Sequence, residues 1–322
     1  MGKYDAIDKE FVREPAHAAE IISNAVYKCR LRVLPHELEV IHPKCKASGK
    51  TGAELERDAL FLCKKHAVKY GIEVENYTDY GMPRRILGYD AGEYEKEADE
   101  IWKEHKKNGD LKDFVERKSR MKETDGYYGI VNVVVYLGAG HYKGRQSLKE
   151  CLKNPPDKIR PLIYEQIEDY QFKVFEVERE KPENYHTELR QFIEAMQARY
   201  DKKKLSNLFE REEFQNLSTL TQRALAVHLG NSTLCRKVIE EGENMCKALR
   251  DLEKDWKMEG RIEGRIEEGI STIRLFLKDL GTIPESVNHK LEEEKDLEVL
   301  GSWVKFAAKS ESIAEFVKKA GL

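Results

Sequence analysis

The sequence predicts an α/β fold followed by an all-helical C-terminal region. Up to about residue 205, the patterns alternate in the order helix, hairpin, helix, strand, helix, strand, helix. Such mixing is typical of helices packed around one sheet. From residue 206 onward the patterns are essentially all helical. We therefore expect three segments: a core at 1–205, a helical extension at 206–258 and a helical tail at 259–322.

Composition narrows the functional classes. The chain has 322 residues, 36% of them charged, and a net charge of −3. This balance excludes a surface that is positively charged all over, so any contact with nucleic acid must rest on local basic patches. The N-terminus is polar, and no apolar run approaches the ~18 residues of a membrane span. We expect a cytoplasmic protein without membrane spans, whose six cysteines are free thiols.

The first predicted helix runs from Pro15 to about Tyr27. Proline suits a first helical turn, and apolar residues follow at helical spacing: Ala18, Ile21, Ile22 and Val26. Beyond this helix, four zinc-type ligands lie in one short segment: Cys29, His36, His42 and Cys45. Their spacing is irregular, whereas structural zinc sites usually have closely paired ligands. Unbound thiols and imidazoles are the favoured interpretation, and zinc stays open.

The segment 57–75 admits two predictions. As a hairpin centred on the Lys65–His66 bond, it pairs Asp58 with Glu73 across two strands. Glu75 lies two residues along the second strand and would share the same face. Three carboxylates on one face repel each other. A hard cation such as Mg²⁺ relieves that repulsion, because it prefers carboxylate oxygens.

The alternative for this segment is one amphipathic helix from Ala53 to Tyr70. Thr51 and Glu54 have the spacing of a capping box, and apolar residues fall loosely on one helical face: Leu55, Leu62 and Val68. In that case Asp58 is a solvated helix residue. The pattern alone does not decide, because short apolar runs are ambiguous between helix and strand.

Pro83 begins a predicted helix that runs to about Lys107, with Arg84 and Arg85 in its first turn. A guanidinium there could bind a phosphate or pair with a neighbouring acid, and the ion pair is favoured for either arginine taken singly. The clearest strand is 130–137. Its β-branched run indicates burial on both faces, in the middle of a sheet with helices on either side.

A second strand at 170–177 and an amphipathic helix at 189–200 complete the predicted core. In the tail, Glu259–Ile262 and Glu263–Ile266 repeat the sequence Glu-Gly-Arg-Ile. Each glycine costs ~1 kcal/mol in a helix interior, so two of them indicate a joint or close approach by a partner helix. We expect a linker helix and a small helical bundle, with these helices as a candidate surface for homo-oligomers.

Three motifs occur in order: Gly-Ile-Glu-Val-Glu-Asn at 71–76, Tyr-Gly-Met-Pro-Arg-Arg at 80–85 and Tyr-Asp-Ala at 89–91. Together they resemble the Rpn family of recombination-promoting nucleases, or putative transposases, which have the PD-(D/E)XK nuclease fold. The resemblance extends over about residues 15–275. It implies a restriction-endonuclease-like mixed β-sheet flanked by helices.

The resemblance also implies an active site. Asp58 and Glu73 match the first two acidic positions of the family motif. Glu75 stands where the family has glutamine and wider relatives have lysine. A glutamate donates no hydrogen bond and carries no positive charge, so it cannot orient water as those residues do. The departure at Glu75 puts activity in doubt, though not the fold.

On this resemblance, Asp58 and Glu73 are expected to hold Mg²⁺ or Mn²⁺, and Glu75 is an extra ligand or a base. Glu20, on the first helix, is a candidate third ligand or an ordinary exposed glutamate. Three basic residues are candidates for contacts with DNA phosphates: Lys69, Arg84 and Arg85. The implied function is metal-dependent DNA endonuclease activity linked to recombination or mobile elements. The alternative is a catalytically impaired nuclease fold that acts as a DNA-binding or oligomerising module.

Overall fold

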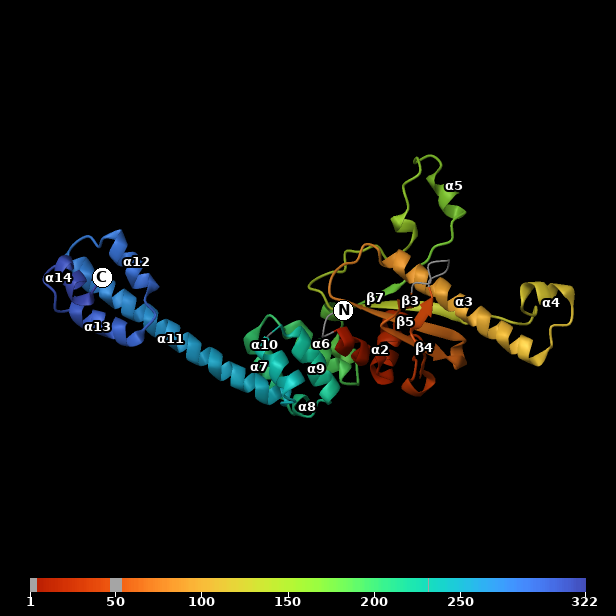
Figure 1. Ribbon diagram of the computed structural model, residues 1–322, viewed down its shortest axis with the longest axis horizontal. Helices are drawn as coiled ribbons and strands as arrows, with labels where there is room; N and C mark the ends of the chain where they lie inside the picture. Colours follow the sequence, from red (N-terminus) through yellow and green to blue (C-terminus); the bar gives the residue numbers. More distant parts are fainter. Residues whose placement is uncertain (1–4, 47–53, 231) are drawn as a thin grey trace. The chain divides into compact units, whose positions relative to one another are not determined.

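A five-stranded mixed sheet lies at the centre of the first of two units (Figure 1). The computed structural model describes residues 5–46, 54–230 and 232–322. The sheet has the order β1-β4-β5-β6-β7, with these bounds: β1 (Glu39–Val40), β4 (Ala59–Cys63), β5 (Val68–Glu75), β6 (Gly129–Tyr136) and β7 (Lys173–Glu176). A separate pair joins β2 (Lys44–Lys46) to β3 (Glu54–Glu56). The predicted α/β class is confirmed.

Strands β4 and β5 form the predicted antiparallel hairpin. Their register pairs Ala59 with Ile72 and Cys63 with Val68, as a turn centred on the Lys65–His66 bond requires. The alternative, a helix over 53–70, is wrong, because the chain reverses direction between the two strands. The side chain of Cys45, one of the four residues of the zinc alternative, lies outside the described part of the structure.

The predicted central strand is β6. It lies parallel to β5 on one side and to β7 on the other. Its Val133, Val134 and Val135 are buried, as the β-branched run predicts. The long connection from β5 to β6 contains α3 (Met82–Asn108) and the short α4 (Phe114–Ser119), and α5 (Arg160–Glu165) precedes β7.

The two faces of β5 are covered by different helices. Lys69 and Glu73 point toward α3, where they contact acidic and basic side chains of that helix. Tyr70 and Val74 point to the opposite face, toward α1 (Asp5–Arg13) and α2 (Pro15–Ala25). This alternation follows from the two-residue period of a strand. It places the odd-numbered polar residues of β5 under α3.

The helices after the sheet belong to the same unit. They are α6 (Leu189–Ala198), α7 (Lys202–Phe209), α8 (Glu212–Gln215), α9 (Thr219–His228) and α10 (Ser232–Cys235). His228 on α9 lies 2.7 Å from Asp8 on α1, so these helices pack back onto the start of the chain. The two units divide at residue 246. The sequence-based boundaries at 205 and 258 therefore do not separate compact units.

The second unit is the predicted small helical bundle. Its elements are α11 (Met245–Leu280), α12 (Glu285–Glu293), α13 (Leu297–Ala307) and α14 (Ile313–Ala320). Ile273, Leu277, Leu291, Leu300 and Phe316 are buried together in its core. The repeat lies within α11, and a Cβ at Gly260 or Gly264 would meet nothing within 4 Å. Among the described residues, no helix has both the length and the apolar character needed to cross a membrane.

Candidate active site

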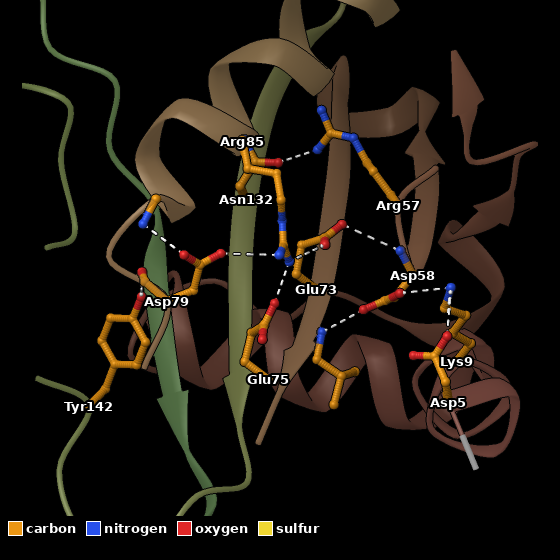
Figure 2. A network of polar contacts seen from close by, with 12 residues as sticks. Asp5, Lys9, Arg57, Asp58, Glu73, Glu75, Asp79, Arg85, Asn132 and Tyr142 are labelled. Carbon is orange, nitrogen blue, oxygen red and sulfur yellow. Dashed lines mark hydrogen bonds and ion pairs between the residues drawn. The ribbon is translucent and has the colours of Figure 1, made fainter. Parts of the chain in front are cut away.

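A cluster of ion pairs lies between the end of β5 and the start of α3 (Figure 2). Arg85, in the first turn of α3, reaches Glu73 with its Nη2 atom, 3.0 Å from Oε2. The same nitrogen contacts the carboxylate of Glu75. Nη1 donates to Asp79 at 3.1 Å. One guanidinium therefore joins three carboxylates. For Arg85, the structure bears out the favoured prediction of an ion pair with neighbouring acids.

Asp58 lies beside Glu73, as the hairpin register predicts. Its backbone N–H donates to Glu73 Oε1 at 3.3 Å. The chain bends at Asp58, however, and the Asp58 carboxylate turns to other partners. Oδ2 accepts a hydrogen bond from the Val74 N–H at 2.8 Å, and Oδ1 lies 3.3 Å from Lys9 Nζ on α1. The Asp58 carboxylate thus has other partners than those of Glu73 and Glu75. The prediction that the three carboxylates lie together on one face is wrong.

Burial dominates the electrostatics of this cluster. Glu73 is only 2% exposed, and burial together with the nearby Asp58 raises its pKa to about 8 despite the contact with Arg85. Burial also raises the pKa of Glu75 and of Asp58, against the opposing effects of Arg85 and of the Val74 N–H. A buried carboxylate loses hydration and is repelled by its neighbours, so the neutral form is favoured. An additional cation would relieve this imbalance.

A second, buried ion pair joins the segment before β4 to α3. Arg57 is 1% exposed and contacts Asp90 on α3 and Asn132 on β6. The amide of Asn132 in turn donates to both oxygens of Asp90, at 3.1 and 3.0 Å. A Cβ at Gly71 would lie 2.1 Å from Arg57 Nη1, so glycine leaves the space that the guanidinium occupies on β5. This network ties the segment before β4 to α3 and β6, with its guanidinium lying over Gly71 of β5.

Sequence patterns did not reveal Arg57, Lys9 or Asp79. A glycine inside a strand does indicate close approach by another group, so Gly71 carried a signal for Arg57. Asp79 accepts the Gly81 N–H at 2.7 Å just before α3, which is a common position for aspartate. No sequence pattern indicated a role for Lys9, because its partner Asp58 is remote in sequence and only the fold brings the two together.

Two predicted site residues lie elsewhere. Lys69 is 5% exposed, and its ammonium lies 2.9 Å from both Glu93 and Glu97 on α3. Because it is buried in these ion pairs, the prediction that it contacts a DNA phosphate is wrong. Glu20 accepts hydrogen bonds from the His186 N–H at 2.7 Å and from the Thr187 hydroxyl at 2.6 Å. The structure does not bring Glu20 to Asp58, because its carboxylate anchors the segment before α6.

Arg84 is exposed beside Arg85 on α3. Among the described residues, its side chain takes part in no ion pair or hydrogen bond. Its charge is therefore available to solvent, unlike that of Arg85. Of the three basic residues predicted to contact phosphate, Arg84 alone is exposed.

The carboxylates of this cluster are the type of ligand that a hard divalent cation prefers. Mg²⁺ and Mn²⁺ prefer carboxylate oxygens, and Mg²⁺ keeps several waters, so it needs only one or two protein carboxylates. Glu73 lies on β5 and Asp58 in the bend before β4, and the Asp58 N–H donates to Glu73 Oε1. Across residues 5–46, 54–230 and 232–322, no group of three or more His, Cys, Asp or Glu side chains is arranged to hold a metal ion. Asp58 and Glu73 are therefore ligands of the right kind, and in this structure their carboxylates have separate partners, Lys9 for Asp58 and Arg85 for Glu73.

Known proteins supply no further guide to this site. No family model, no curated protein and no solved structure matches the chain. The assignment of a function therefore rests on the fold, on the contacts of Asp58, Glu73 and Arg85, and on the resemblance of the three motifs.

Proposed function

We propose that the protein is a metal-dependent DNA endonuclease with a restriction-endonuclease-like fold. One observation carries the proposal: Asp58, in the bend just before β4, donates its backbone N–H to Glu73, which is buried on the adjacent strand β5. This is the pair of acids that the resemblance places at the active site. The mixed sheet flanked by helices supports the same fold, and the resemblance supplies the link to recombination or mobile elements.

In this proposal, Asp58 and Glu73 hold Mg²⁺ or Mn²⁺. When bound, such a cation polarises the phosphoryl oxygen and lowers the pKa of a bound water. Glu75 lies beside Glu73, and its buried carboxylate accepts the proton of the attacking water, since burial raises its pKa and makes it a stronger base. Arg84 supplies positive charge to the backbone of the substrate from the exposed side of α3.

A plasmid-nicking assay tests this function. We expect the purified full-length protein to convert supercoiled DNA to the open circle with Mg²⁺ or Mn²⁺ and not with EDTA. The variant Glu73→Gln removes the charge at nearly constant shape and should abolish nicking under every condition. Absence of nicking by the wild-type protein with either metal would overturn the proposal, as would equal nicking by the variant.

A second function is favoured by a specific observation. Arg85 already contacts Glu73 and Glu75, so the chain supplies its own cation where a metal would bind. Glu75 also departs from the glutamine or lysine of the family motif. An inactive nuclease fold that binds DNA or oligomerises would have both features. Retardation of DNA on a gel without nicking under any metal would support this second function over the first.

A further inference from the structure

Arg85 has two sets of partners on opposite sides of its guanidinium. Nη2 contacts Glu73 and Glu75 on β5, whereas Nη1 donates to Asp79, 3.1 Å away, in the connection before α3. Asp79 is itself held in place, because its other oxygen accepts the Gly81 N–H at 2.7 Å. Figure 2 shows the guanidinium between the glutamates and Asp79. Arg85 can therefore release one set of partners and still keep an ion pair.

The hydrogen-bonding capacity of Arg85 is incompletely used. Among the described residues, the Arg85 Nε is a buried donor without a hydrogen-bond partner. The side chain is 31% exposed, whereas Glu73 and Glu75 are 3% and 7% exposed. Thus the buried carboxylates are fixed by β5, and the arginine is the partner with access to solvent. If one group moves when a cation arrives, it is Arg85.

A guanidinium and a divalent cation compete for the same oxygens. Glu73 is proposed to hold the metal, and its Oε2 lies 3.0 Å from Arg85 Nη2. Two cations in contact with one buried carboxylate repel each other strongly, because the local dielectric constant is far below that of water. A metal can bind Glu73 closely only when Arg85 withdraws.

We propose that Arg85 is the internal counter-cation of this site and competes with the divalent metal for Glu73 and Glu75. The inference rests on the proposed function, because it takes Glu73 as a metal ligand. In the metal-free protein, Arg85 neutralises the two glutamates and joins β5 to α3. When the metal binds, Arg85 withdraws toward Asp79. Arg85 is thus a positioning residue that weakens metal binding, and not a ligand.

Calorimetric titration with Ca²⁺, in the absence of DNA, tests the competition without any readout of activity. The proteins compared are the wild type, Arg85→Ala, Arg84→Ala and the double variant Arg85→Ala/Glu73→Gln. We expect Arg85→Ala to bind Ca²⁺ about tenfold more tightly or better, equivalent to about 1.4 kcal/mol. Arg84→Ala is the matched control, since it removes the same charge from the same turn but no contact with the glutamates. The double variant should lose the gain.

The outcomes separate this inference from the proposed function. If wild type and Arg85→Ala bind Ca²⁺ equally and the double variant Arg85→Ala/Glu73→Gln does not bind it, the competition is wrong and the metal site stands. If neither protein binds Ca²⁺ or Mn²⁺, the inference and the proposed function both fail. An equal gain in Arg84→Ala would reduce the effect to general charge and would also overturn the competition. Arg85→Gln serves as a second variant, with circular dichroism of each protein to verify folding.

Discussion

Replacing Asp58 with asparagine is expected to lower metal-dependent nicking by about 100-fold or more while the fold is kept. The asparagine oxygen can still accept the hydrogen bond from the Val74 N–H, so the bend before β4 retains its main support. The charge that would hold the cation is lost. A bound metal contributes several kcal/mol to stabilisation of the transition state, and each 1.36 kcal/mol corresponds to a factor of ten in rate.

The measurement is the initial nicking rate at saturating Mn²⁺, with Asp5→Asn as the control. Asp5 also pairs with Lys9, at 3.3 Å, but makes no contact with Glu73 or Val74 among the described residues. Its variant should therefore nick at close to the wild-type rate. A wild-type rate for Asp58→Asn would remove Asp58 from the active site. Equal losses in both variants would assign the effect to Lys9 instead of to metal binding.

The largest expected effect on stability is that of Arg57→Ala, which should destabilise the sheet unit by about 3–5 kcal/mol. The substitution leaves Asp90 buried without its cation, and an uncompensated buried charge has a cost of this size. It also removes the guanidinium from the face of the Tyr89 ring, 5.1 Å from its centroid. Arg57 thus holds the segment before β4 to α3 and β6.

Hydrogen exchange of β5 and β6 amides, followed against urea concentration, measures the stability of this unit separately from the C-terminal bundle. Arg84→Ala is the control and should change stability by no more than about 0.5 kcal/mol, as for other surface substitutions. The pair Arg57→Met/Asp90→Leu should recover much of the loss, because apolar groups can replace a buried ion pair. A loss for Arg57→Ala no larger than that of Arg84→Ala would contradict the assigned role of the network.

The pairing of the hairpin could be predicted because it depends only on the centre of the turn. Any symmetric loop centred on the Lys65–His66 bond brings Asp58 opposite Glu73, and the register agrees. The central strand β6 could be predicted equally well from the sequence, because a run of valines has few alternatives to a buried strand. In both cases the information is local in the chain.

The partners of the acidic residues could not be predicted in the same way. The bend at Asp58 turns its carboxylate to Val74 and Lys9, and a regular two-residue alternation does not anticipate a bend. Lys69 has the chemistry of a phosphate contact, but Glu93 and Glu97 from the fourth and fifth turns of α3 enclose it. Such pairings join residues far apart in sequence, so periodicity does not contain them.

Anomalous diffraction from crystals soaked in Mn²⁺ tests the central claim, that Asp58 and Glu73 form a divalent-cation site, most directly. We predict one anomalous peak within coordination distance of both carboxylates, with the Arg85 guanidinium turned from Glu73 toward Asp79. The Arg85→Ala crystal should show the same peak at a lower Mn²⁺ concentration. No peak at these carboxylates in either crystal, with Arg85 still on Glu73 and Glu75 in the wild type, would contradict the account.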